Sequence, residues 1–208
     1  MRNVMVCFLT TFVVVVLSST GCSHRRRKHK IEPLQITTTA LSEGEVGVAY
    51  PTSTLSATGG TTPYSWSDVN NTLQTYGLSL DPNTGEITGT PTQATTTGGV
   101  TVTIKVTDAN NNTAQKDFTL VIYPELQITT TSLPNATEGV AYSSTVTASG
   151  GNAANYSWSI SGQPSWLSID ATTGELSGTP PTGSAGNTYT FTVTVDDLSL
   201  IHISEPTR

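Results

Sequence analysis

Hydrophobic and polar residues alternate along several short stretches of the chain. The stretch 100–106 has valine or isoleucine at every second position, with threonine and lysine between them. The stretches 118–122 and 189–195 alternate in a similar way. A period of two residues is typical of a β-strand that buries one face, and β-branched threonine suits the outer face of a pleated sheet. We therefore predict strands at these positions; no stretch has a convincing helical period.

Clusters of glycine, proline, asparagine and aspartate separate the predicted strands. Two turns share an aspartate followed four residues later by a glycine, namely Asp81 with Gly85 and Asp170 with Gly174. The glycine suits a position with positive φ, and the carboxylate can accept hydrogen bonds from the turn amides. The stretch 109–113 is predicted to be a hairpin loop. Short strands separated by such turns favour an antiparallel sandwich.

The chain repeats itself after about 92 residues. Three motifs show this most clearly: Leu-Gln-Ile-Thr-Thr-Thr at 34–39 and 126–131, Gly-Val-Ala-Tyr at 47–50 and 139–142, and Tyr-Ser-Trp-Ser at 64–67 and 156–159. A repeat of this length corresponds to one small domain rather than to a solenoid unit. We therefore predict two similar modules, module one at 34–124 and module two at 125–197.

The three tryptophans fall into two groups. Trp66 and Trp158 occupy equivalent positions after glycine-rich loops, and burying one such side chain contributes at most about 5 kcal/mol. We predict that both belong to the cores of their modules, with a sugar-stacking platform as the alternative. Trp166 differs because module one has Gly77 at that position, so the fold does not require it. Trp166 is therefore the best candidate for a ligand contact.

Charge is distributed unevenly and limits the possible partners. Between residues 31 and 197 there are two basic and 14 acidic residues, a net charge of −12. A surface of this charge repels phosphate backbones, so we predict no nucleic-acid binding. Both cysteines and all three histidines lie outside the modules. The modules therefore contain no disulfide and lack the commonest general base and metal ligand.

Residues 1–22 have the composition of an export signal. A short positive start precedes the apolar stretch 4–17, which has 14 residues, whereas a membrane-spanning helix needs about 20. Small residues follow, and then Cys22. This order is typical of a signal peptide and predicts that the protein is exported.

The end of this signal, Ser19-Thr20-Gly21-Cys22, resembles the lipobox of bacterial lipoproteins, although that family prefers leucine at the position of Ser19. The resemblance implies cleavage before Cys22 and a diacylglycerol on its sulfur. It would hold the protein at the bacterial cell surface or outer membrane by its lipid. A lone cysteine beside an ordinary cleavage site is the alternative.

The segment 23–33 is predicted to be a basic tether. After export its charges would lie against anionic headgroups, and a tether free in solvent is the alternative. A basic run so close to the apolar stretch conflicts with the usual charge bias for export, since lysine and arginine prefer the cytoplasmic side.

The last 11 residues, 198–208, break the repeat abruptly. They resemble the translation of a transposase sequencing adapter, so we exclude them from the predicted fold as an artefact. In the alignment of the two copies, 102–108 matches 191–197, and module one then continues through 109–124. We therefore predict that module two lacks its last strand and that the natural protein is longer.

The motif at 164–180, Pro-Ser-Trp-Leu-Ser-Ile-Asp-Ala-Thr-Thr-Gly-Glu-Leu-Ser-Gly-Thr-Pro, is echoed at 77–91. It resembles the He-PIG repeats of bacterial surface proteins and the related dystroglycan-type cadherin-like domains, and the likeness covers about 34–197. It implies an all-β fold of tandem immunoglobulin-like or cadherin-like antiparallel Greek-key sandwiches, here without disulfides. Members of the family occur in adhesins or as spacers beside catalytic domains.

Related cadherin-like domains bind calcium between modules, so Ca²⁺ is the cofactor to consider. The residues that could contribute oxygen ligands near the junction are Glu43, Glu45, Asp108, Asn110 and Glu125. Ca²⁺ takes six to eight oxygens, and the chain lacks the acidic motifs of true cadherins. The alternative is that Asp108 and the neighbouring asparagines form turns.

Three functions can be weighed on this basis. The first is a non-catalytic, membrane-anchored surface protein whose modules serve in adhesion or as a stalk, with other surface proteins or glycans as partners. The second is an N-terminal accessory region, spacer or carbohydrate-binding, of a larger secreted hydrolase. The third is catalysis by paired carboxylates, as in glycosidases, which is disfavoured because the carboxylates recur at turn positions in both copies. We favour the first.

Overall fold

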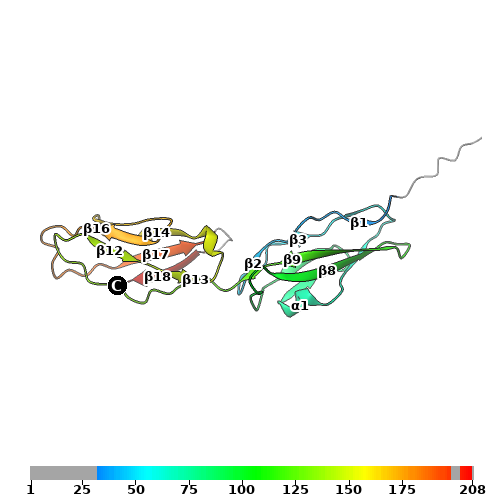
Figure 1. Ribbon diagram of the computed structural model, residues 1–208, viewed down its shortest axis with the longest axis horizontal. Coiled ribbons are helices and arrows are strands. Elements are labelled where there is room, and N and C mark those ends of the chain that lie inside the picture. Colours follow the sequence, from blue (N-terminus) through cyan, green and yellow to red (C-terminus); the bar gives the residue numbers. More distant parts are fainter. Residues whose placement is uncertain (1–31, 198–201, 208) are drawn as a thin grey trace, which may run out of the picture. The chain divides into compact units, whose positions relative to one another are not determined.

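The computed structural model describes residues 32–197 and 202–207 (Figure 1). The predicted signal peptide with its lipidation residue Cys22, most of the basic tether, and residues 198–201 and 208 lie outside this description. Within it, almost all regular structure is β-strand, in agreement with the all-β prediction. The helices in the described part are too short to cross a membrane.

Module one contains ten strands and a one-turn helix. Their bounds are β1 (Gln35–Ile36), β2 (Gly44–Glu45), β3 (Ser53–Thr54), β4 (Ala57–Thr58), β5 (Ser65–Asp68), α1 (Thr72–Thr75), β6 (Leu78–Leu80), β7 (Glu86–Gly89), β8 (Val100–Thr107), β9 (Thr113–Leu120) and β10 (Ile122–Tyr123). The strands pair in the orders β1-β4, β3-β7-β6, β5-β8-β9 and β10-β2. All these pairs are antiparallel except β10 with β2, which run parallel.

The helix α1 was not predicted. It is a single turn, in which the Asp68 carboxylate accepts a hydrogen bond from Leu73 N at 2.7 Å. The Leu73 side chain is buried in the core. Four residues are too few to show a helical period in a sequence, so the alternating pattern gave no sign of it.

Module two repeats these pairings. Its elements are β11 (Gln127–Ile128), β12 (Tyr142–Thr145), β13 (Ala148–Ser149), a short 3₁₀ helix (Ala153–Asn155), β14 (Ser157–Ser161), β15 (Leu167–Ile169), β16 (Glu175–Gly178), β17 (Phe191–Asp196) and β18 (His202–Thr207). The orders β11-β13, β12-β16-β15 and β14-β17-β18 correspond to β1-β4, β3-β7-β6 and β5-β8-β9.

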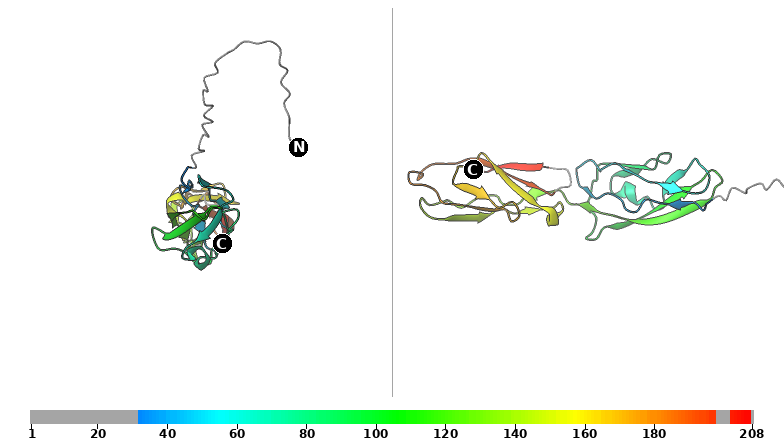
Figure 2. Two further views of the ribbon diagram at one scale, coloured as in Figure 1. Left: turned by 90° about the vertical axis from the view of Figure 1, so that its right-hand side faces the viewer. Right: turned by 90° about the horizontal axis from the view of Figure 1, so that it is seen from above.

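The last strand of module two corrects the sequence-based prediction. The strand β18, red in Figure 2, pairs antiparallel with β17 from Phe191↔Thr207 to Asp196↔His202, the place that β9 takes beside β8. The prediction that module two lacks its last strand is therefore wrong for this chain. The free edge of β17 offers backbone N–H and C=O groups, which pair with any extended segment whatever its side chains. The described residues contain no counterpart of β10, and the origin of 198–208 stays a prediction.

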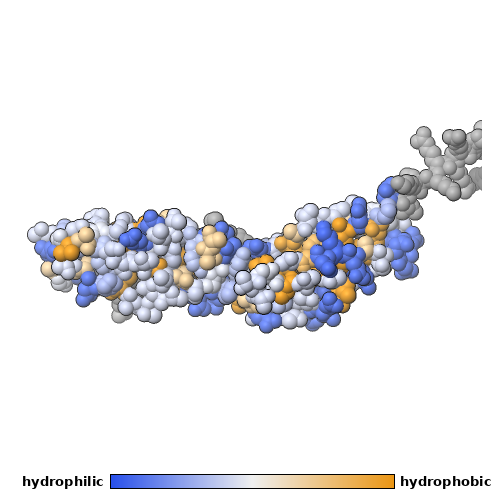
Figure 3. All heavy atoms as spheres, in the orientation of Figure 1, coloured by the Kyte–Doolittle hydropathy of each residue, from blue (hydrophilic) through white to orange (hydrophobic). Residues whose placement is uncertain are grey.

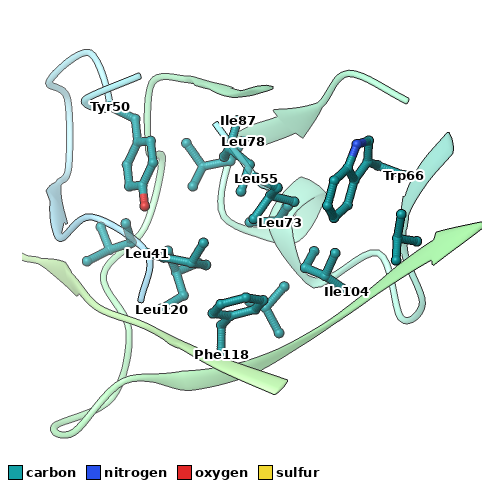
Figure 4. Close-up of a cluster of buried hydrophobic side chains, with 13 residues drawn as sticks. Leu41, Tyr50, Leu55, Trp66, Leu73, Leu78, Ile87, Ile104, Phe118 and Leu120 are labelled. Atoms are coloured by element: carbon teal, nitrogen blue, oxygen red, sulfur yellow. The ribbon is translucent and has the colours of Figure 1, made fainter. Parts of the chain in front are cut away.

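Each module has its own hydrophobic core. In module one, Trp66 and Phe118 pack with aliphatic residues of the facing strands (Figure 4). Along β8 the buried positions are Val102, Ile104 and Val106, each 0% exposed, which is the alternation read from the sequence. Module two has a separate core around Trp158. Large exposed hydrophobic side chains are few among the described residues, Val69 and Val140, and the face in Figure 3 is mostly polar.

Candidate functional site

The first aspartate–glycine turn packs directly against a core tryptophan. The Asp81 carboxylate accepts hydrogen bonds from Asn83 N at 2.7 Å and Thr84 N at 2.9 Å. These bonds lower the pKa of Asp81, and the bond from Thr84 has the largest effect. Gly85 has a φ of +73°, and a Cβ there would lie 2.8 Å from Trp66 Nε1. The turn and the tryptophan therefore form one structural unit, and the carboxylate stabilises that unit.

Module two repeats this unit. The Asp170 carboxylate accepts hydrogen bonds from Thr172 N at 2.9 Å and Thr173 N at 2.8 Å. These bonds lower the pKa of Asp170, and the bond from Thr173 has the largest effect. Gly174 has a φ of +71°, and a Cβ there would lie 2.9 Å from the indole of Trp158. Like Trp66, Trp158 is only 5% exposed. Neither side chain presents the open face that sugar stacking needs.

A buried carboxylate closes the glycine-rich loop of module one. Asp108, 4% exposed, accepts hydrogen bonds from the backbone of Thr61, Asn110 and Asn112 at 2.8–2.9 Å, and from the Asn112 side chain at 2.9 Å. The side-chain bond from Asn112 is the main cause that lowers the pKa of Asp108, against the opposing effect of burial. Asp108 thus acts in a turn, which is the alternative that the sequence left open.

Module two contains an equivalent carboxylate, Asp197, which we did not single out from the sequence. It is 1% exposed and accepts a hydrogen bond from Asn152 N at 2.6 Å. The signal was present in the alignment, since Asp108 and Asp197 both follow the penultimate strand and both face a Gly-Gly loop. A Cβ on Gly60 or Gly151 would come within 2.7 Å or 2.6 Å of the respective carboxylate oxygen.

The five residues proposed for calcium do not form one site. Asp108 and Asn110 lie at the hairpin end of β8 and β9, whereas Glu43, Glu45 and Glu125 lie near β10 at the opposite end. An eight-residue strand spans about 26 Å at about 3.3 Å per residue, and calcium–oxygen distances are about 2.3–2.6 Å. Nor does any group of three or more His, Cys, Asp or Glu in the described chain have the geometry to hold a metal. The prediction of this five-residue calcium set is wrong.

The three glutamates of this set instead accept hydrogen bonds from the protein's own groups. Glu45 is 3% exposed, and its Oε1 accepts a hydrogen bond at 2.7 Å from the backbone N of Leu126, the residue that opens the repeat in module two. Glu43 is exposed and accepts a hydrogen bond from the Tyr123 hydroxyl at 3.1 Å. Burial is the main cause that raises the pKa of Tyr123, and this hydrogen bond raises it further. Glu125 accepts a hydrogen bond at 3.3 Å from the side chain of Gln127.

Trp166 lies in a hollow of module two that has a volume of about 430 Å³. We call it the module-two groove and define it by six of its lining residues, Leu133, Ala136, Tyr142, Trp166, Ser184 and Phe191. The Trp166 ring meets Tyr142 and Tyr189 edge to face, with centroids 6.3 and 6.0 Å apart. Its Nε1 is buried and has no hydrogen-bond partner within the described structure. A buried donor of this kind is uncommon in a finished core.

The lining of the groove is suited to binding. Among its described residues Glu138 is the one charged side chain, and its Oε2 accepts a hydrogen bond from Ala185 N at 3.0 Å. The volume falls in the range of about 300–1,000 Å³ that is usual for binding pockets. The rest of the lining is aromatic, aliphatic and small polar side chains. Such a surface offers apolar contacts and hydrogen-bonding groups but little charge.

Two sandwiches in tandem, each with the β5-β8-β9 type of ladder and a buried tryptophan, define a protein of immunoglobulin-like modules. The family model described as "Putative Ig domain" (He_PIG) matches residues 30–123 and 125–207. The chain belongs to this family, as the motif at 164–180 indicated. Repeat domains of this type are typically non-catalytic, and they suggest an extracellular protein.

Solved structures with similar folds are also arrays of such domains. The I-band fragment I67–I69 from titin has a TM-score of 0.50 at 12% identity, covering 85% of this chain and 65% of the fragment. Sidekick-1 immunoglobulin domains 1–5 have a TM-score of 0.48 at 13% identity, covering 86% of this chain and 39% of the Sidekick-1 chain. Protocadherin gamma B7 cadherin domains 1–4 have a TM-score of 0.36 at 16% identity, covering 84% of this chain and 48% of the protocadherin chain.

At such identities the titin match supports the fold alone, and the chain spans less than half of the Sidekick-1 and protocadherin structures. No match was found among curated proteins.

Proposed function

We propose that this chain is a lipid-anchored surface protein whose two modules act outside the cell as non-catalytic spacer or adhesion units. The observation that carries the proposal is the tandem repetition of one structural unit, with its core and its turns, in a family of extracellular modules. Tandem arrays of self-contained domains provide reach or repeated binding surfaces rather than a catalytic cleft.

The placement of the carboxylates supports the non-catalytic part. A glycosidase needs two carboxyl groups facing one substrate across about 5–10 Å. In this chain Asp81, Asp170 and Asp108 accept hydrogen bonds from their own turns, and Glu45 accepts one from Leu126. Their hydrogen-bonding capacity is directed to the backbone of the protein.

The lipid anchor is tested at Cys22, which lies outside the described residues. Expressed with its own signal in a bacterium, the protein should partition with membranes and into detergent, and Cys22→Ala should shift it to the soluble fraction. Cys7→Ala is the matched control, because it changes the other cysteine within the signal and should leave partitioning unchanged. Equal membrane partitioning of Cys22→Ala and the unaltered protein would contradict the anchor.

Adhesion and spacing can be separated at Trp166. Cells that display the full chain would be assayed for attachment to glycan-coated and protein-coated surfaces. Trp166→Gly introduces the residue that module one has at the equivalent position, Gly77. Loss of attachment in this variant would assign adhesion to the module-two groove, whereas attachment that no substitution in the modules reduces would leave them the spacer role. Turnover of a glycoside substrate by the chain would contradict the proposal.

A further inference from the structure

The turn between β5 and α1 presents an asparagine whose side chain the fold of module one does not use. Asn70 is exposed, and its backbone N donates a hydrogen bond to Asp68 Oδ1 at 3.3 Å. Among the described residues, its side-chain amide has no hydrogen-bond partner. By contrast, the side chains of Asn110 and Asn112 donate hydrogen bonds that close the loop at Asp108. The Asn70 amide is therefore accessible to another molecule.

The residues around Asn70 form an acceptor sequence for a glycan. Asparagine followed two positions later by threonine or serine is the sequence at which exported proteins receive an oligosaccharide on the asparagine amide. Asn70-Asn71-Thr72 fits this pattern, and so do the triplets at 111–113, 135–137 and 155–157. The first asparagine of each triplet is exposed. Exposure therefore does not distinguish one triplet from another.

An acidic residue distinguishes the triplet at Asn70 from the other three. Asp68 lies two positions before Asn70, whereas Ala109, Leu133 and Ala153 lie at the equivalent positions of the other triplets. The segment 68–72 thus has a carboxylate, an amide and a hydroxyl at alternate positions, which share one side of an extended chain. A transferase with a basic group can bind this side by a charge-assisted hydrogen bond to the carboxylate.

In the folded module the segment 68–72 is not extended. Asp68 Oδ2 accepts a hydrogen bond from Leu73 N at 2.7 Å, and Asn71 has a left-handed backbone with a φ of +55°. α1 is a single turn (Figure 1), too short to be stable by itself. However, Leu73 is 1% exposed, so opening α1 would uncover part of the core. An enzyme can therefore bind this segment in extended form most easily before module one folds.

An exposed apolar side chain lies next to Asn70. Val69 is 45% exposed, and its backbone N donates a hydrogen bond to Thr103 O at 2.9 Å, which holds the turn against β8. Large exposed hydrophobic side chains are rare among the described residues, with Val140 as the other example. A glycan on Asn70 would shield this apolar surface after folding.

We infer that Asn70 is an acceptor site for an N-linked glycan, selected over the other triplets by Asp68 and modified before module one folds. The Asn70 side-chain nitrogen attacks C1 of the first sugar of a lipid diphosphate-linked oligosaccharide. The bond from C1 to the diphosphate oxygen breaks, the lipid diphosphate leaves with the electron pair, and one amide proton passes to a base of the transferase. The inference rests on the export that the proposed function includes, and not on the lipid anchor or adhesion.

The test is expression in a bacterium that contains an oligosaccharyltransferase requiring an acid at this position, together with its lipid-linked oligosaccharide. The full chain should gain the mass of one glycan, and peptide mass spectrometry should place it on Asn70 and not on Asn111, Asn135 or Asn155. Two versions are compared, one with the chain's own residues 1–22 and one with a host signal peptide in their place. If only the host-signal version crosses the membrane and is modified, the inference holds and the proposed export fails.

Matched variants identify the groups that the transferase recognises. Thr72→Ala should abolish the added mass, and Thr72→Ser should keep it. Asp68→Asn keeps a side-chain oxygen for Leu73 N but loses the charge, so the modified fraction should fall roughly tenfold, the effect of one charge-assisted hydrogen bond. Asp68→Glu keeps the charge and should keep the modification. Ala153→Asp supplies the missing acid to the triplet of Asn155 and should make it a second site.

Two outcomes would overturn the inference. One is a host-signal version that crosses the membrane with Asn70 unmodified. The other is equal modification of Asn70 and Asn111 in the unaltered chain, which would show that Asp68 selects nothing. Because the glycan is located by peptide mass, a variant that does not fold still gives a result, and the unaltered chain decides the site.

Discussion

The two modules share their interior and differ at one end. Both have a buried tryptophan packed on an aspartate–glycine turn, and both have a carboxylate under a Gly-Gly loop. At the other end module one is closed by β10, whereas module two has the groove beside Trp166. The comparison teaches that the repeat preserves the groups that build a core, while the connection into β6 and β15 differs, with Gly77 in module one and Trp166 in module two.

The route of the chain explains part of this divergence. In module one the helix α1 leads into β6 through Gly77, whose φ is +81° and where a Cβ would lie 2.6 Å from Thr90 O. A larger residue could not be placed there without moving the backbone. Module two enters β15 without a helix, and Trp166 precedes its first residue. A change of connection thus creates room for an aromatic side chain.

The largest effect is expected from removing one core tryptophan. Trp66→Ala should destabilise module one by about 3–5 kcal/mol, the usual cost of truncating a buried aromatic residue, and Trp158→Ala should do the same to module two. Amide exchange measured at increasing denaturant concentration should show that each variant affects its own module, since Trp66→Ala leaves module one without a tryptophan to follow by emission. Equal loss of both modules in either variant would show that the two cores unfold as one.

A smaller effect is expected at the turn glycines. Gly85→Ala or Gly174→Ala should cost about 2–4 kcal/mol, since alanine disfavours a left-handed backbone and its Cβ would also collide with the indole. Gly139→Ala is the control: its φ is +71°, but a Cβ there would have nothing within 4 Å, so about 1–2 kcal/mol is expected. Thermal unfolding measures the difference, and equal losses would mean that the tryptophan contact contributes nothing.

The next largest effect is a difference in stability between substitutions at Glu45 and at Glu43, the two glutamates of module one near residue 126. Glu45→Ala leaves the buried N–H of Leu126 without this acceptor and should cost about 1–3 kcal/mol. Glu43→Ala changes an exposed side chain and should stay within about 0.5 kcal/mol. Faster exchange of the Leu126 amide in Glu45→Ala than in Glu43→Ala would locate the effect, and identical exchange would rule it out.

The smallest effect is expected on the melting temperature at low pH. The turn hydrogen bonds lower the pKa of Asp81, Asp108 and Asp170 from the ordinary value of 3.8. A carboxyl whose pKa is lower in the folded state stabilises that state above its unfolded pKa, and this contribution is lost as the pH falls through the folded pKa. We expect the melting temperature to fall below about pH 4, and Asp81→Asn to flatten that fall for module one only. A melting temperature that rises on acidification would contradict this.

Much of the fold could be read from the sequence because it repeats local rules twice. Alternation located β8, β9 and β17, and the aspartate–glycine spacing located both turns. What the sequence could not show was long-range pairing. Leu126, the partner of Glu45, lies 81 residues away, and Thr61, one of the partners of Asp108, lies 47 residues away. For Asp108 the sequence therefore left both a calcium-ligand and a turn interpretation open, and for Glu45 it gave no sign of the bond to Leu126. The groove likewise depends on long-range packing, because Leu133, Trp166 and Phe191 line it together.

The parallel pair of β2 and β10 has a mechanical consequence. β2 lies near the start of module one and β10 near its end, so tension on the chain pulls the two strands along their axes in opposite directions. The bonds Gly44 N–Val121 O and Val46 N–Tyr123 O then bear load together instead of opening one after another. In a stretched chain we expect this pair to resist the lengthening of module one until both bonds break.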